Sequence, residues 1–166
     1  GANLSTYFWR QVNDFATWAA HSAAETMTAQ MINRLDAAGA NDLDVFITTY
    51  YFNHPTLRFL IPTGRPLQRL ETTAQLPLEV TPGHGALLVM NPESHALFDV
   101  AMRVYPNGRF DELHPPMTGP PVLYTVRLSP ADVESVQGLE GRYYANARHA
   151  GEPAFTARDR TLDFDW

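Results

Sequence analysis

Three apolar runs in this chain are each followed at once by one or two polar residues and a proline. The runs end in "YYFNHP", "LLVMNP" and "TVRLSP". Each run is short and apolar throughout, which is typical of a strand buried on both faces of a sheet. Asn and Ser are good helix caps, and proline is tolerated in the first turn of a helix. The sequence therefore predicts strands at 44–52, 85–90 and 121–128, each followed by a helix. The predicted helix caps are Asn53, Asn91 and Ser129.

A longer helix is predicted before the first of these strands, at residues 23–38. Its apolar residues recur every three or four positions, as expected for one buried helix face. Ser22 and Glu25 have the spacing of a capping box, in which each side chain bonds a free backbone N–H group. Gly39 follows as the residue that ends the helix in the left-handed conformation.

The remaining segments carry weaker patterns. Residues 4–20 favour one or two short helices, and residues 66–71 favour a short fourth strand near an edge of the sheet. The stretches 72–85 and 111–121 are rich in proline and glycine and are predicted to be irregular. The first domain is expected to close near residue 137.

Strands that alternate with short capped helices indicate an α/β fold with parallel pairing. We expect a three-layer architecture, with a mainly parallel sheet of about four to five strands flanked by helices in a Rossmann-like arrangement. This α/β domain covers residues 1–137. Residues 138–166 form a β-rich C-terminal tail.

Composition excludes several classes of function. The net charge of -6 and the isoelectric point of about 5.4 argue against a nucleic-acid partner, whose phosphates require a basic face. The chain has no cysteine, which excludes disulfides and thiolate metal sites. No run approaches the roughly 18 apolar residues of a membrane span. The sequence opens with "GAN" rather than Met, which is consistent with a piece cut from a larger membrane protein.

Polar side chains gather where the first two predicted strands end. Ligands of open α/β sheets usually bind beyond the carboxyl ends of the strands, so these residues are the candidate ligand-binding set. A histidine with a carboxylate could perform general acid–base catalysis, and two histidines with a glutamate could hold a metal. The simpler alternative is that these residues only cap helices. The candidates are Tyr50, Tyr51, Asn53, His54, Asn91, Glu93, Ser94 and His95.

Known catalytic motifs do not occur in the chain. The segment Gly83-His84-Gly85 precedes a strand, whereas a phosphate-binding glycine loop must follow one, so we assign it to a tight turn. His114 and His149 lie in predicted loops without a ligand partner at metal spacing. We therefore predict no cofactor, no metal and no assigned catalytic residue.

The end of the chain resembles a known family. "GLEGRYYANARHAGEPAFTARDRTLDFDW" is similar to the first strands of the sugar-binding β-sandwich named after the anthrax protective antigen. The resemblance implies that residues 138–166 are the start of such a domain and that the chain stops inside it. That family's ligand and calcium loops lie beyond this segment, so no binding residue carries over. The matching residues are Gly138, Leu139, Gly141, Tyr143, Tyr144, Gly151, Pro153, Asp159, Asp163, Phe164, Asp165 and Trp166.

The front of the chain has a more diffuse resemblance. "YFWRQVNDFATWAAHSAAETMTAQMINRL", the following strand and "HPTLRFL" resemble the extracytoplasmic region of polytopic bacterial glycosyltransferases. These enzymes are related to the protein O-mannosyltransferases and aminoarabinose transferases and use polyprenyl-phosphate sugars. The resemblance places the catalytic carboxylate of that family between early membrane spans, outside this chain.

The function expected from these observations is that of a non-catalytic accessory domain on the extracytoplasmic side of a bacterial membrane. Its partners would be the membrane-embedded part of the same polypeptide and a carbohydrate. One alternative is a small independent hydrolase or transferase that uses His54, Glu93 and His95. Another is a structural spacer. We also expect the tail to lie against the α/β domain or a neighbouring chain, because unpaired strand edges seek partners.

Overall fold

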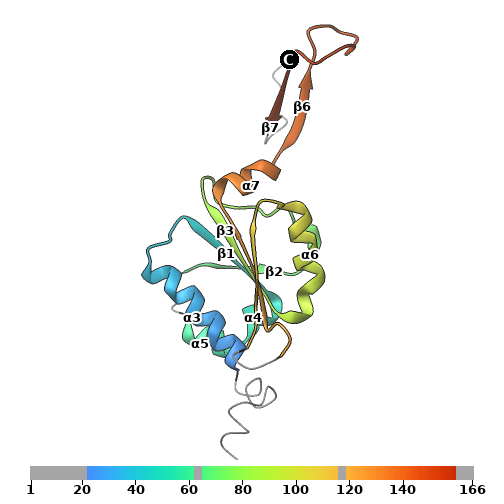
Figure 1. Ribbon diagram of the computed structural model, residues 1–166. Coiled ribbons are helices and arrows are strands. Elements are labelled where there is room, and N and C mark those ends of the chain that lie inside the picture. The colour runs from blue at the N-terminus through green and yellow to red at the C-terminus, as the bar shows by residue number, and fades with distance from the viewer. Residues whose placement is uncertain (1–21, 62–64, 116–118, 160–166) are drawn as a thin grey trace, which may run out of the picture.

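The computed structural model describes residues 22–61, 65–115 and 119–159, and its main body is a mixed five-stranded sheet in the order β2-β1-β3-β5-β4 (Figure 1). β1 pairs in parallel with both β2 and β3, whereas β5 is antiparallel to β3 and β4. The strands are β1 (Leu43–Thr48), β2 (Leu67–Leu70), β3 (Gly85–Met90), β4 (Arg109–Leu113) and β5 (Leu123–Leu128).

Helices cover both faces of this sheet, so the fold is a three-layer α/β structure. One core cluster joins the sheet to α3 and α5, and the other joins the opposite face to α6 and α7. In Figure 1, α3 and α5 accordingly lie on one side of the strands and α6 on the other. The helices are α3 (Ala23–Ala37), α4 (Thr49–Asn53), α5 (Pro55–Leu60), α6 (His95–Val104) and α7 (Pro130–Val136), with short 3₁₀ turns η1 (Thr73–Gln75) and η2 (Pro92–Ser94).

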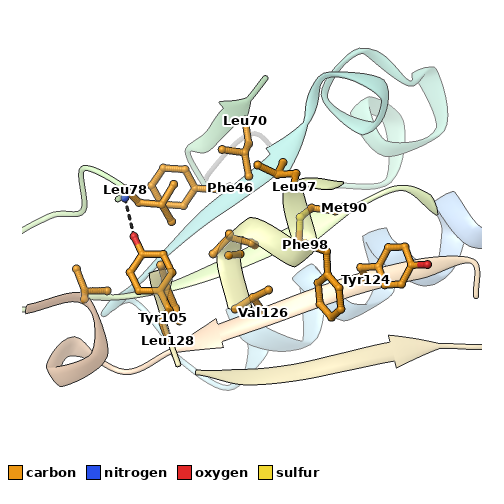
Figure 2. Close-up of a cluster of buried hydrophobic side chains, with 14 residues drawn as sticks. Phe46, Leu70, Leu78, Met90, Leu97, Phe98, Tyr105, Tyr124, Val126 and Leu128 are labelled. Carbon is orange, nitrogen blue, oxygen red and sulfur yellow. Dashed lines mark hydrogen bonds between the residues drawn. The ribbon is translucent and has the colours of Figure 1, made fainter. Parts of the chain in front are cut away.

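The two cores follow the two-residue period of the central strands. Val45 and Ile47 of β1 contribute to the core under α3, while Phe46 contributes to the core under α6. Figure 2 shows the second core, in which the Tyr105 hydroxyl accepts a 2.6 Å hydrogen bond from the backbone N–H of Leu78. This bond attaches the irregular segment before β3 to the end of α6.

Several predicted elements are confirmed. The helix predicted at 23–38 is α3, and Gly39 follows it with φ of +68°. All six residues of β3 are buried, β2 is an edge strand, and Ser129 forms a capping box with Asp132 at the start of α7.

The predicted capping box at the start of α3 is wrong. Ser22 has a left-handed backbone conformation and makes no side-chain cap bond. Glu25 instead points inward and accepts a hydrogen bond from the hydroxyl of Tyr50. A tertiary hydrogen bond to Tyr50 has therefore replaced the local cap.

The first strand ends earlier than predicted. β1 stops at Thr48, the last residue paired with β2, and residues 49–53 then turn into α4. Asn53 is therefore the last residue of α4, and His54 occupies the N-cap position of α5 instead. The Tyr51 side chain is buried in the core under α3 because this helical turn folds it back toward the sheet.

The prediction of a mainly parallel sheet is correct only in part. β4 falls within a region predicted to be partly irregular, because an edge strand whose residues are all exposed or half-buried has a polar sequence. The chain returns from β4 directly into β5, and such a short connection produces an antiparallel pair. The sheet is therefore mixed.

Gly85 lies at a close approach between strands. A Cβ atom at this position would overlap the backbone carbonyl oxygen of Leu128. Glycine is required here because β3 and β5 meet without room for a side chain.

The described part of the tail is a separate antiparallel hairpin. β6 (Leu139–Tyr143) pairs with β7 (Phe155–Asp159), and the rings of Tyr143 and Phe155 stack with centroids 4.5 Å apart. The hairpin projects away from the five-stranded sheet beyond α7 (Figure 1). The hairpin does not lie against the five-stranded sheet, so that part of the expectation is wrong, while packing against a neighbouring chain stays a prediction.

Two predictions concern regions that the structure does not test. The helices expected at 4–20 and the end of the tail at 160–166 lie outside the described residues. Within the described ranges, no helix is long and apolar enough to cross a membrane.

Candidate functional site

The carboxyl ends of β1 and β3 bring most of the predicted site residues into one region. The two strands are parallel neighbours, so the segments that follow them leave the sheet at the same edge. The Thr48 hydroxyl, at the end of β1, donates a 2.6 Å hydrogen bond to Oδ1 of Asn91, which follows β3. Both side chains are buried, so this bond joins the two segments inside the protein.

Asn91 organises the residues that follow β3. Its side-chain amide donates a 2.6 Å hydrogen bond to Oε2 of Glu93, and its Oδ1 accepts a 2.9 Å bond from the Ser94 hydroxyl. Asn91 was predicted both as a cap and as a ligand-binding residue. Its side chain connects the two strand ends and orients the exposed Glu93 carboxylate.

Tyr50 and His54 lie beside a carboxylate that the sequence analysis missed. The Tyr50 hydroxyl donates a 2.7 Å hydrogen bond to Oε1 of Glu25, and Nε2 of His54 lies 3.8 Å from the same oxygen. The rings of Tyr50 and His54 have centroids 5.5 Å apart. Glu25 lies in α3. Because its spacing from Ser22 fits a capping box, the sequence pattern does not indicate its contacts with Tyr50 and His54.

Tyr50 is influenced by both carboxylates of this region, Glu25 and Glu93. The hydrogen bond to Glu25, followed by burial and the nearby charges of Glu25 and Glu93, raises the pKa of Tyr50 to about 12. Tyr50 therefore stays protonated and remains a hydrogen-bond donor at neutral pH. Its side chain is nevertheless half exposed, at 50%.

Tyr51 is a structural residue rather than a surface ligand. It is 1% exposed, and its hydroxyl donates a 3.2 Å hydrogen bond to the carbonyl of Val122. Burial raises the pKa of Tyr51. Asn53 is exposed at the end of α4 and has no side-chain hydrogen bond to a described residue.

His95 takes part in different contacts. Its Nδ1 lies 3.1 Å from Oδ2 of Asp99, and its ring packs edge-on against Tyr124 on the α6 side of the sheet. None of the described contacts links it to His54 or Glu93. The structure therefore does not form the predicted cluster of His54, Glu93 and His95, and no metal-binding group of three ligands occurs among the described residues.

The resulting candidate surface, called here the Tyr50 surface, consists of Tyr50, His54, Glu25, Asn91 and Glu93. It presents one half-exposed aromatic ring together with an imidazole and an exposed carboxylate. Nδ1 of His54 is buried and has no hydrogen-bond partner among the described residues. These groups can pack against an apolar ring face and exchange hydrogen bonds with hydroxyl groups.

A second polar group at the opposite ends of the same strands was also missed. Asp44, at the start of β1, contacts the His84 ring at 2.9 Å. The sequence pattern places His84 in a turn before a strand, whereas ligands of open α/β sheets are expected beyond the carboxyl ends of strands. The pairing of Leu43 with Gly85 is what brings the two residues together.

Comparison of the chain with protein-family models, curated proteins and solved structures finds no match.

Proposed function

We propose that this chain is a non-catalytic accessory domain that binds a saccharide on the Tyr50 surface. The observation that carries the proposal is the half-exposed Tyr50 ring, whose hydroxyl is held by the buried Glu25 carboxylate. An aromatic ring fixed in this way loses little conformational freedom when a ligand packs against it. Aromatic side chains also provide a large apolar face beside a polar group, which suits the mixed surface of a sugar.

The neighbouring polar groups supply the other half of the recognition. The exposed Glu93 carboxylate can accept hydrogen bonds from sugar hydroxyls, and Asn91 holds it in place. The His54 ring lies beside the Tyr50 ring, with centroids 5.5 Å apart. Hydrogen bonds to a charged acceptor are the stronger kind, so Glu93 would contribute specificity.

The proposed setting is the extracytoplasmic face of a bacterial membrane, as part of a glycosyltransferase-like membrane protein. The two sequence resemblances motivate it, and the antiparallel pairing of β6 with β7 is compatible with the start of a β-sandwich. In this setting the domain would bind glycan or acceptor beside the membrane-embedded part of the same polypeptide. The Rossmann-like relationship and the domain boundary at residue 137 remain part of this proposal.

The test is saccharide binding by the full chain, screened on a glycan array and measured by saturation-transfer NMR. Tyr50→Ala is expected to weaken binding of a positive saccharide at least about tenfold, about 1.4 kcal/mol. Tyr50→Phe keeps the ring but removes the hydroxyl that Glu25 holds, so it should weaken binding, though less than Tyr50→Ala does. The matched control is Phe59→Ala, which removes an aromatic side chain that is 88% exposed on α5.

The absence of any saccharide binding, or an equal loss in Tyr50→Ala and Phe59→Ala, would overturn the proposal. The exposure of Phe59 favours one second candidate, a domain that packs against the rest of its parent protein as a spacer. The alternative of a small hydrolase or transferase that uses His54, Glu93 and His95 is less favoured, because the described contacts of His95 are with Asp99 and Tyr124.

A further inference from the structure

A cleft of about 520 Å³ lies at the amino ends of β1 and β2, opposite the Tyr50 surface. This volume is within the range of small-molecule binding sites. Its walls come from the end of α3, the starts of both strands and the segment before β3. Seven polar side chains line it: Asp36, Asn41, Asp44, Arg65, Gln68, Thr81 and His84.

Asp44 and His84 form an oriented pair in this cleft. Oδ1 of Asp44 lies 2.9 Å from Nδ1 of His84, and Oδ2 accepts a 2.7 Å hydrogen bond from the backbone N–H of Thr81. Burial raises the pKa of Asp44, but the hydrogen bonds from Thr81 and His84 outweigh burial and hold the pKa below its ordinary value. Asp44 is therefore ionised and can only accept hydrogen bonds, so Nδ1 of His84 carries the proton.

This assignment leaves Nε2 of His84 available to a ligand. In a neutral imidazole with a protonated Nδ1, Nε2 is a hydrogen-bond acceptor. No described residue forms a hydrogen bond with Nε2, and the His84 side chain is 31% exposed. The ring therefore has one nitrogen anchored by the fold and one available in the cleft.

The charges in the cleft already have partners. The Arg65 guanidinium, in a side chain only 7% exposed, is paired with Asp36. It also donates hydrogen bonds of 2.9 Å and 2.7 Å to the backbone carbonyls of Leu43 and Ala40. An anionic or cationic ligand would have to compete with these pairs, whereas a neutral ligand would not.

The side-chain amides of Asn41 and Gln68 are two further polar groups in the cleft. Both residues are exposed, and neither side chain hydrogen-bonds to a described residue. An amide both donates and accepts hydrogen bonds, as a hydroxyl does. We propose that the cleft is a binding site for a small neutral polyhydroxylated molecule, with Nε2 of His84 accepting a hydroxyl hydrogen and the amides of Asn41 and Gln68 bonding its neighbours.

The test is a ¹H–¹⁵N NMR titration of the full chain with D-glucose and myo-inositol. Inorganic phosphate and spermidine serve as the charged comparisons. At least one neutral probe should give saturable shifts at residues 41–44 and 81–84. Phosphate and spermidine should give none that saturate.

His84→Asn separates binding from folding, because the asparagine amide can replace Nδ1 as donor to Asp44 but supplies no equivalent of Nε2. It should weaken binding of the neutral probe about tenfold. Gln68→Ala, at an exposed position of β2, should also weaken it. The control His114→Asn alters an exposed histidine outside the cleft and should leave affinity unchanged.

The proposal is overturned if no neutral probe saturates, if a charged probe saturates instead, or if His84→Asn binds as wild type does. It does not depend on the Tyr50 surface, because Tyr50→Ala should leave these shifts intact. If Tyr50→Ala abolished the same NMR shifts, the probe would be binding at the Tyr50 surface rather than in the cleft. That result would also overturn the proposal.

Discussion

The two ends of β1 are attached to their surroundings by different chemistry. At the carboxyl end, neutral side chains make the connection: the Thr48 hydroxyl bonds Asn91, and both are buried. At the amino end, charged groups make it, through Arg65 with Asp36 and Asp44 with His84. A buried neutral bond is insensitive to salt and to mild changes of pH, whereas ionic contacts beside an open cleft respond to both. We therefore expect the attachment of β1 at its carboxyl end to be insensitive to salt and pH, and the attachment at its amino end to respond to both.

Replacement of Arg65 should produce the largest effect. Arg65→Ala removes the partner of Asp36 and two donors to backbone carbonyls, so we expect a loss of about 3 kcal/mol in the free energy of unfolding. Urea unfolding measured by circular dichroism provides the value.

Arg69→Ala is the matched control for this substitution. Arg69 and Glu71 form an ion pair in which both side chains are nearly half exposed, and such pairs contribute only about 0 to 1 kcal/mol. If Arg65→Ala and Arg69→Ala lost the same free energy of unfolding, the buried attachment of Arg65 would contribute no more than a surface ion pair. That result would contradict the comparison.

Thr48→Val tests the carboxyl end. Valine has nearly the same shape but cannot donate to Oδ1 of Asn91, so we expect a loss of about 1.5 kcal/mol. Unfolding experiments at pH 7 and pH 4, with and without added salt, should give the same loss. A loss that varies with salt would contradict the description of this end as a neutral connection.

Among the three substitutions at the ends of β1, Asp44→Asn should have the smallest effect, and that effect should depend on pH. The pKa of Asp44 is lowered by folding, so ionised Asp44 stabilises the folded state above the ordinary carboxyl pKa of roughly 4. This contribution disappears as the pH falls through the lower, folded-state pKa. The variant should therefore be less stable than wild type by about 1 kcal/mol at pH 6, and the difference should shrink toward pH 3. A difference that grows on acidification would reverse the sign of the proposed linkage.

The sheet was largely predictable because its strands carry strong local patterns. The apolar run of β3 and the Ser129–Pro130 start of α7 need no tertiary information, since burial on both faces and helix capping leave direct traces in sequence. The sequence of β4 predicts a strand less clearly. An edge strand with one partner keeps polar residues, and its polar sequence is then indistinguishable from that of a loop.

The candidate site was predictable only as far as strand adjacency could be inferred. The meeting of the Tyr50 and Asn91 segments follows from the parallel pairing of β1 with β3. The role of Glu25 does not, because a glutamate three residues after a serine has a complete local explanation as a cap. The Asp44–His84 pair also depends on the strand register, which local patterns do not specify.

The crowding at Gly85 has a consequence for tracing the ancestry of this fold. Most core positions accept another apolar residue of similar size, so their identities drift over time. Gly85 cannot drift in this way, because any side chain would meet the carbonyl oxygen of Leu128. A glycine that opens an apolar strand, with an asparagine directly after that strand and a threonine at the end of its parallel neighbour, is therefore a three-point signature. It could identify diverged descendants long after overall similarity has faded.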